Sequence, residues 1–207
     1  MTDPEQAALP FGPLDREAWH VCIDMQRLFL EPGEWYCPAG LALLPGIAAL
    51  CAHAPERSAF TRFITAQEPA EASGRWRPYY ERWRSVTRGV IGEAAMGLHP
   101  ELLPLAKEEL VFDKLGHDAF SGEAFAAFVE QAKPSALVLS GIETEVCVLA
   151  TAMTAIDLGI RVVIVTDAVA SSDPAAHQAC LELIYPRFDQ QVELADTARV
   201  IAGWPSR

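Results

Sequence analysis

The stretch ALVLSGIETEVCVLATAMTAIDLGIRVVIVTD (residues 136–167) decides the fold class, because it joins two apolar runs through one helical segment. The run ALVLSG is continuously apolar, which is typical of a strand buried on both faces, and RVVIVTD is predicted to be the next strand. The segment between them, 143–159, has helical periodicity and ends at Gly159, a C-terminal cap residue. Its inward stripe is predicted to be Val146, Leu149, Ala150 and Met153. Strand, helix and strand in this order predict a βαβ unit with parallel strands.

The same alternation continues on both sides of this stretch. Further strands are predicted at 19–24, 57–66, 109–114 and 190–195, and further helices at 45–54, 121–132, 173–185 and 196–203. Ser121 and Asp173 are the expected caps of two of these helices, with Pro174 at the first helical position. The predicted fold is therefore an α/β three-layer α/β/α sandwich, Rossmann-like, with a mostly parallel six-stranded sheet.

The chain length of 207 residues fits one domain. Residues 1–18 read as an N-terminal extension. Residues 67–90 are rich in Pro, Gly, aromatic and Arg residues, so we expect an irregular excursion from the core. Two interpretations of this excursion stay open. Its aromatic and Arg side chains suit a lid that clamps a carboxylate, and they suit equally a surface helix or a subunit interface.

The charge balance restricts the partners. The chain has 28 acidic and 16 basic residues and a net charge of −12. This predicts no nucleic-acid partner and no binding to an anionic membrane surface. The acidic start carries no signal-peptide pattern, and no apolar run approaches the roughly 20 residues that cross a bilayer. The expected location is therefore the cytoplasm.

The five cysteines form no disulfide framework, because their number is odd and no C-x-x-C pair occurs. They are Cys22, Cys37, Cys51, Cys147 and Cys180. Each lone cysteine is by default a small buried hydrophobic residue. Only the position of Cys147, at the start of a predicted helix, suggests another role.

Three polar residues follow three predicted strands. Asp24 closes the first strand, Lys114 ends the third, and Cys147 lies just after the fourth. The carboxyl ends of parallel strands meet at one edge of a sheet, where reactive residues of α/β folds usually lie. Each residue also has an ordinary structural interpretation, as a cap, a solvated charge and a packed thiol.

Together the three residues suit acyl transfer. A cysteine attacks as the thiolate, and a helix N-terminus and a nearby Lys are expected to lower its pKa. A carboxylate accepts the proton and later returns it to a leaving amine. Backbone N–H groups at the helix start face the developing oxyanion.

Three motifs resemble the isochorismatase-like cysteine hydrolase superfamily, which includes nicotinamidases and N-carbamoylsarcosine amidases. They are IDMQRLF (23–29), VFDKLGHDAF (111–120) and SGIETEVCVLATAMTAIDLGIRVVIVTDAVASSDPAAH (140–177). The likeness runs from about Val21 to Ile201 and is most specific in the last motif. It implies hydrolysis of a C–N bond of a small amide, ureide or N-carbamoyl compound through a thioester, without a cofactor.

The resemblance also implies roles for single residues. Cys147 would be the nucleophile, Asp24 the proton carrier and Lys114 the electrostatic partner. A cis peptide between Ile142 and Glu143 would turn the Glu143 N–H toward the oxyanion, beside that of Cys147. A homo-oligomer, a dimer or tetramer, is expected.

Two departures from the family pattern matter. Many members carry an Asp-x-His metal pair after the second strand, where this chain has Gln67 and Pro69. We therefore predict no metal and treat nicotinamidase activity as disfavoured. A cysteine at position 147 also argues against the vinyl-ether reaction after which the family is named.

The candidates for substrate contact come from the motifs and from the excursion. They are Phe29, Gln67, Trp76, Tyr80, His117 and Phe120. Two alternatives to an enzyme stay open: a non-catalytic small-molecule-binding or scaffold protein with the same fold, and a redox-sensing thiol.

Overall fold

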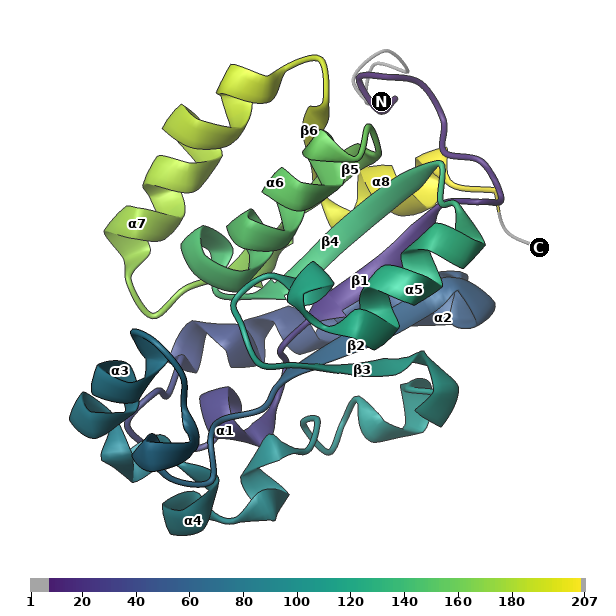
Figure 1. Cartoon of the computed structure of the whole chain (residues 1–207). Helices are drawn as coiled ribbons and strands as arrows, with labels where there is room; N and C mark the ends of the chain where they lie inside the picture. Colours follow the sequence, from purple (N-terminus) through teal and green to yellow (C-terminus); the bar gives the residue numbers. More distant parts are fainter. Residues whose placement is uncertain (1–7, 206–207) are drawn as a thin grey trace.

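Six strands form one parallel sheet in the computed structural model of the protein, which describes residues 8–205 (Figure 1). They are β1 (Trp19–Ile23), β2 (Ser58–Phe63), β3 (Val111–Lys114), β4 (Ala136–Ile142), β5 (Arg161–Ala170) and β6 (Val192–Ala195). The spatial order is β3-β2-β1-β4-β5-β6, and every neighbouring pair is parallel. The predicted α/β fold is thus confirmed, and the sheet is wholly rather than mostly parallel.

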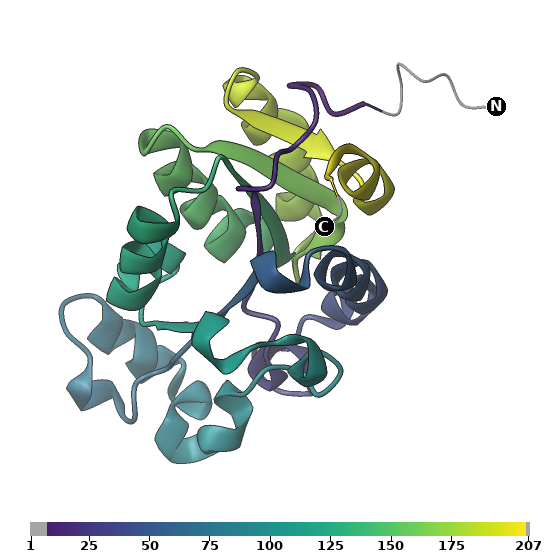
Figure 2. The same cartoon turned by 90° about the vertical axis from the view of Figure 1, so that its right-hand side faces the viewer.

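Helices cover both faces of the sheet (Figures 1 and 2). The α-helices are α1 (Arg27–Leu30), α2 (Leu44–His53), α3 (Trp76–Arg82), α4 (Arg88–Ile91), α5 (Glu123–Ala132), α6 (Leu149–Asp157), α7 (Pro174–Ala179) and α8 (Thr197–Gly203). Residues of α2 and α8 share one buried cluster, and residues of α5 and α6 share another. The sheet therefore separates two hydrophobic cores, as a three-layer sandwich requires.

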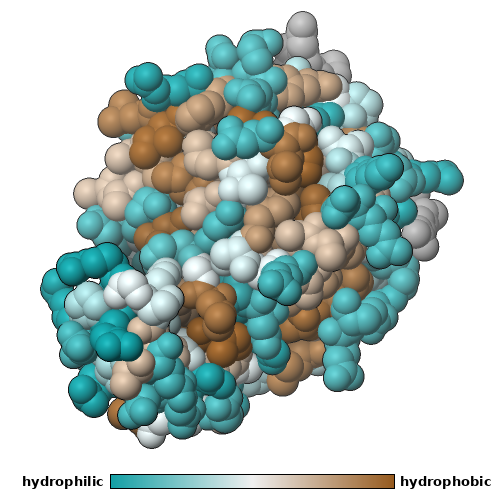
Figure 3. Space-filling model, viewed as in Figure 1, coloured by the Kyte–Doolittle hydropathy of each residue, from teal (hydrophilic) through white to brown (hydrophobic). Residues whose placement is uncertain are grey.

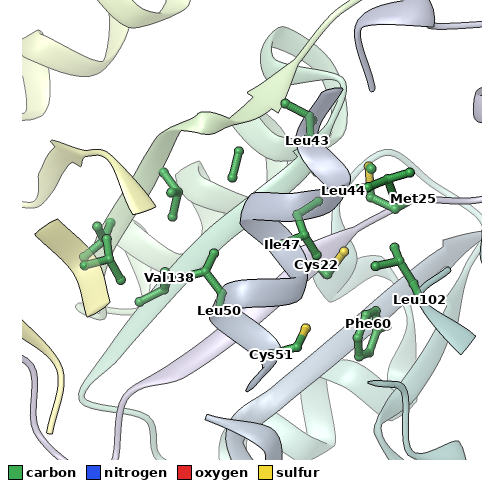
Figure 4. Packing of buried hydrophobic residues seen from close by; sticks show 14 of the residues in the cluster. Cys22, Met25, Leu43, Leu44, Ile47, Leu50, Cys51, Phe60, Leu102 and Val138 are labelled. Atoms are coloured by element: carbon green, nitrogen blue, oxygen red, sulfur yellow. The ribbon is translucent and has the colours of Figure 1, made fainter. Parts of the chain in front are cut away.

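The first core lies under α2 (Figure 4). Ile47 and Leu50 of α2 are fully buried, and they belong to the same cluster as Cys22 of β1 and Phe60 of β2. Leu9 and Leu14, from the described part of the N-terminal segment, belong to this cluster too. Residues 8–18 are therefore packed onto the domain. The rest of the predicted N-terminal extension lies outside the described residues.

The second core corrects the predicted helix stripe. The buried residues here are Cys147, Val148, Thr151, Ala152, Ala155 and Ile156, whereas Val146, Leu149, Ala150 and Met153 are only partly buried. Val146, Leu149 and Met153 still pack against the same cluster. Small or apolar residues lie on most sides of this helix, so the hydrophobic pattern alone does not fix its buried face. A π-helical turn, Thr144–Val148, precedes α6.

The two predicted caps have different outcomes. Asp173 caps α7, because its Oδ1 accepts hydrogen bonds from the N–H groups of Ala175 and Ala176. The Ser121 cap is wrong. Gly122 is the N-cap of α5, and the Ser121 hydroxyl instead donates to the Asp118 carbonyl at 2.6 Å.

The excursion between β2 and β3 contains α3 and α4, and it lies outside the helices that cover the two faces of the sheet (Figures 1 and 2). Its arginines hold the segment itself together. Arg77 donates to the carbonyls of Ala70 and Ala72, and Arg88 donates to the carbonyl of Thr65. Two of the arginines that could clamp a carboxylate, Arg77 and Arg88, are thus used on backbone oxygens. A subunit interface at this segment stays a prediction.

Hydrophobic residues also gather on the outer surface. Figure 3 shows them over the part of the molecule where α6 and α7 lie. Leu158 and Leu183 are among the exposed large hydrophobic residues. None of the helices in residues 8–205 combines the length and apolar character needed to cross a bilayer.

Candidate active site

The carboxyl ends of three strands bring together side chains from distant parts of the chain. Asp24 follows β1, Lys114 ends β3, and Cys147 lies in the π-helical turn after β4. Lys114 Nζ is 2.7 Å from Asp24 Oδ2, and each side chain is 1 % exposed. Cys147 is 6 % exposed and interacts electrostatically with both. The three residues singled out in the sequence therefore form one buried cluster.

Gly141 allows β1 and β4 to end close together. Its φ is +106°, and a Cβ here would lie 2.0 Å from the Ile23 carbonyl oxygen. Only glycine fits so close a backbone approach. Asp24 follows Ile23 with φ +52°, a left-handed conformation that Asp adopts more readily than most residues. This turn places the Asp24 carboxylate beside the segment that follows β4.

The two oxygens of Asp24 have different surroundings. Oδ1 accepts a hydrogen bond of 2.7 Å from the Thr61 hydroxyl of β2. Oδ2 lies against Lys114 Nζ, yet it has no aligned hydrogen bond to any described residue. The contact with Lys114 is thus an ion pair without hydrogen-bond geometry. One oxygen is held in place, and the other can accept a proton.

Lys114 is oriented by two backbone carbonyls. Its Nζ donates to Gly116 at 3.0 Å and to His117 at 2.8 Å. Burial by itself lowers the pKa of Lys114, but Asp24 and then Cys147 raise it, and the net shift is upward. Lys114 therefore stays cationic over the whole neutral range.

Cys147 departs from the expectation of a lowered pKa. Burial raises the pKa of its thiol well above 9, and the Asp24 carboxylate raises it further, whereas Lys114 lowers it. The expected lowering by Lys114 is present, but desolvation and Asp24 outweigh it. The resting site therefore holds a neutral thiol beside an ion pair.

The turn that carries Cys147 is fixed at several points. The Ile142–Glu143 peptide bond is cis, at the position that the sequence resemblance implied. The Glu143 carbonyl accepts hydrogen bonds from Val146 N and Val148 N, both 3.1 Å. The Thr151 hydroxyl donates to the Cys147 carbonyl at 2.8 Å. These contacts set the position of the thiol relative to β4.

A cavity of about 450 Å³ opens onto Cys147. This is within the range of about 300–1,000 Å³ that pockets for small molecules occupy. Its wall consists of Phe29, Glu34, Trp35, Tyr36, Phe63, Tyr79, Trp83, His117, Ile142, Glu143, Val146, Cys147 and Ser172. The cavity suits a substrate of modest size with apolar or aromatic surroundings.

Two of the six predicted substrate contacts, Phe29 and His117, line this cavity. The other four do not line it. Gln67 is exposed, Trp76 and Tyr80 line a second cavity, and Phe120 packs on Phe125. Trp76 still touches the site indirectly, because its ring lies 5.0 Å from that of His117.

The wall also contains residues that the sequence did not reveal. Glu34, Trp35 and Tyr36 come from the loop after β1, and Ser172 follows β5. Their position after strand ends was the available signal. Thr61, which holds Asp24, was missed because a Thr inside a strand normally indicates only β propensity.

The donor set after β2 does not fit the metal site of many relatives. Gln67 is exposed, and Pro69 has no ligating side chain. Within residues 8–205, no group of three or more His, Cys, Asp or Glu residues is arranged to hold a metal ion. We derive no step through a metal.

Alkylation of Cys147 tests these electrostatics without a substrate. At pH 7.5 iodoacetamide should modify Cys147 slowly in the wild type. It should act several-fold faster in Asp24→Asn, because the carboxylate that raises the thiol pKa is gone. Mass spectrometry of the Cys147 peptide measures the rate. The fully buried Cys180, outside the cavity wall, is the internal control. Slower alkylation in Asp24→Asn would contradict the arrangement.

Comparison with protein families gives one match along most of the chain. The family described as "Isochorismatase domain" matches residues 18–196. Two curated proteins are similar over shorter regions. "Isochorismatase family protein 2A" of Dictyostelium discoideum is 32% identical over 75 residues, 35% of this chain and 37% of that protein. "Streptothricin hydrolase" of Streptomyces noursei is 40% identical over 80 residues, 38% of this chain and 29% of that protein. The matched region thus spans about a third of either relative.

Solved structures share the fold at low sequence identity. A cysteine hydrolase from Pseudomonas syringae superposes with a TM-score of 0.75 and 20% identity, over 92% of this chain and 96% of the other. N-carbamoylsarcosine amidase from Thermoplasma acidophilum gives a TM-score of 0.64 and 17% identity, over 87% and 96%. At these identities the likeness establishes the architecture alone.

Proposed function

The chain belongs to the isochorismatase family, and from this premise we propose that it is a metal-independent cysteine hydrolase. Its reaction is cleavage of a C–N bond in a small amide, ureide or N-carbamoyl compound through a thioester. The family and the hydrolases among the relatives support the general reaction class. The substrate and the mechanism are our proposal.

One observation supports this proposal most directly: a buried ion pair lies beside a cysteine thiol that borders a cavity. Asp24 and Lys114 are almost inaccessible, and Cys147 borders the cavity. A purely structural thiol needs neither a charged neighbour nor access to a cavity. Perturbed titratable groups in a cleft are typical of catalytic sites.

In the first half-reaction, Asp24 Oδ2 accepts the thiol proton as Cys147 Sγ attacks the carbonyl carbon. This coupling is needed because burial and Asp24 keep the thiol protonated at rest. Lys114 then faces a thiolate instead of a carboxylate, so the positive charge stabilises the attacking form. The C–N bond breaks, and the departing ammonia or amine takes the proton back from Asp24.

In the second half-reaction, water attacks the thioester. Asp24 accepts the proton of the water and returns it to the sulfur as the C–S bond breaks. The products are a carboxylic acid, or a carbamic acid where a carbamoyl group was transferred, and the free thiol, so the enzyme returns to its starting state.

The oxyanion of both tetrahedral intermediates needs donors. We assign the N–H groups of Glu143 and Cys147 to this role, because both residues border the cavity and both belong to the turn after β4. Two such donors typically contribute a large part of the acceleration of acyl transfer.

Ammonia release tests the proposal. Purified protein is incubated with primary amides, N-carbamoyl amino acids, ureido acids and biuret-like compounds. We expect turnover of members of at least one class. Prior dialysis against a chelator should leave the rate unchanged, because the residues after β2 do not provide a metal site. Release that stops after chelation and returns with a divalent metal would contradict the metal-independent mechanism.

The competing hypothesis is a binding or scaffold protein. It predicts no hydrolysis of any class and no acyl adduct on Cys147 in the intact-protein mass spectrum. The redox-sensing alternative predicts instead that peroxide oxidises Cys147 selectively.

A further inference from the structure

The wall of the cavity carries negative charge without a compensating positive charge. Glu34 and Glu143 are acidic, and none of the thirteen wall residues, all in the described part of the chain, is Lys or Arg. Lys114 lies nearby, but Asp24 neutralises it at 2.7 Å. Burial, and then Lys114, lower the pKa of His117, so its ring is neutral at pH 7. A cavity with this balance attracts cations and repels anions.

The two carboxylates lie at different depths. Glu34 is exposed, and its Oε2 has only a long contact of 3.4 Å with the Ser85 hydroxyl. Glu143 is half-buried. Its Oε1 accepts from Ser172 N at 2.9 Å, whereas its Oε2 makes no hydrogen bond to a described residue. One carboxylate oxygen is thus positioned by the backbone, and the other is free for a ligand. Glu143 also directly precedes the turn that carries Cys147.

Several aromatic residues of the wall surround Trp35. Its ring stacks on Phe29 with 6.0 Å between centroids, and it lies 5.8 Å from Tyr79 and 6.3 Å from Trp83. The faces of Trp and Tyr rings attract cations. The Arg82 guanidinium already lies 5.0 Å from the centroid of Trp83. Rings and carboxylates in one wall favour a positively charged ligand over an apolar one.

The excursion supplies no Lys or Arg to the cavity wall; its residues there are Tyr79 and Trp83. Arg77 and Arg88 donate to backbone carbonyls of their own region. Neither residue belongs to the cavity wall. A carboxylate-bearing substrate would therefore meet two carboxylates in the wall, and no guanidinium belongs to the wall.

We infer that the ligand of this cavity is an organic cation: a small amide or carbamoyl compound with an ammonium, quaternary ammonium or guanidinium group. The cation lies between the aromatic rings and the carboxylates of Glu34 and Glu143, while the carbonyl carbon faces Cys147. That the carbonyl carbon faces Cys147 rests on the proposed function. The binding of the cation does not.

Three matched amides test the charge preference. They share one spacer and differ at the far end: 4-(trimethylammonio)butanamide, its neutral tert-butyl isostere 5,5-dimethylhexanamide, and the anionic glutaramate. Calorimetric titration of Cys147→Ala protein measures binding without turnover. The cation should bind at least about tenfold more tightly than the neutral isostere, and the anion more weakly than either. Equal binding of cation and isostere, tighter binding of the anion, or no binding of any of the three overturns the inference.

Single substitutions in the wall show which residues cause the preference for the cation. Glu34→Gln and Glu143→Gln should each lower the affinity for the cation about threefold or more and leave that for the isostere unchanged. Trp35→Leu should lower the cation's affinity by a similar factor. The control is Glu81→Gln, an exposed residue of α3 outside the wall, which changes net charge equally. An equal loss in Glu81→Gln would mean that overall charge, not the cavity, attracts the cation, and would overturn the assignment.

Wild-type turnover separates this inference from the hydrolase proposal. Selective binding of the cation without ammonia release from any amide would leave the cation site standing and refute the hydrolase. Faster ammonia release from glutaramate than from the cationic amide would support the hydrolase and refute the cation site.

Discussion

Cys147→Ala is expected to lower the rate of amide hydrolysis by at least about 10⁴-fold, because no covalent intermediate can form without the sulfur. KM for a substrate of the wild-type enzyme should change little, since one small side chain is removed from a wall of thirteen residues. The effect therefore lies in kcat. Cys147→Ser should be nearly as inactive, because a hydroxyl is much less acidic than a thiol and Asp24 would have to deprotonate it.

The measurement has two parts. Ammonia release gives kcat and KM, and mass spectrometry of rapidly quenched wild-type protein detects an acyl adduct on the Cys147 peptide. Cys180→Ala is the matched control, since Cys180 is also buried on the α6 side of the sheet but borders neither cavity. It should retain most of the activity. If Cys147→Ala kept a tenth of the wild-type rate, a direct attack by this sulfur would be excluded.

The fold was predictable because its strands are strongly marked. ALVLS and the VVIV of RVVIVT are apolar without interruption, and these residues are buried in two internal strands. The helix after β4 shows where such reasoning fails. Small or apolar residues lie on most sides of this helix, so the pattern did not fix its buried face, and the most buried residues are Val148, Thr151, Ala152, Ala155 and Ile156.

The cluster of Asp24, Lys114 and Cys147 was predictable for a topological reason. Parallel strands place their ends at one edge, so residues at three strand ends can meet although they are far apart in the sequence. The raised thiol pKa was not predictable, because it depends on burial, which only the packed structure defines. Topology thus gives proximity, while desolvation decides the protonation state.

The cavity wall was only partly predictable for a related reason. The sequence shows many aromatic residues in the excursion but not which rings face inward. Tyr79 and Trp83 meet Trp35 across more than forty positions of sequence, whereas Tyr80 turns to the second cavity. Arg77 looked like a carboxylate clamp, because its backbone partners are invisible in a sequence.

Lys114→Met is expected to destabilise the folded protein by about 3–5 kcal/mol, because it leaves the Asp24 carboxylate buried without its counter-charge. Methionine has a similar length, so little of this loss comes from packing. The matched control is Arg62→Met on the neighbouring strand β2. Arg62 pairs with Asp113 of β3 at 2.6 Å, but these side chains are 33% and 50% exposed. An exposed pair of this kind is worth at most about 1 kcal/mol. Urea unfolding of both variants gives the comparison.

The double variant Asp24→Asn/Lys114→Met separates the charge from the side chain. Both partners are then neutral, so at least about half of the lost stability should return.

The dependence of stability on pH supplies a second check. The raised pKa of Lys114 means that the folded state holds this proton more tightly than the unfolded chain does. Its stabilisation is therefore complete below the unfolded lysine pKa of about 10.4 and is lost only as pH rises through the higher folded-state value. Titration of Lys114 itself should accordingly contribute no change in the wild-type unfolding free energy from about pH 6 to 9. A deficit below about 1 kcal/mol, or a double variant no more stable than Lys114→Met, would show that the pair is not the strongly coupled buried unit on which the proposed proton transfer depends.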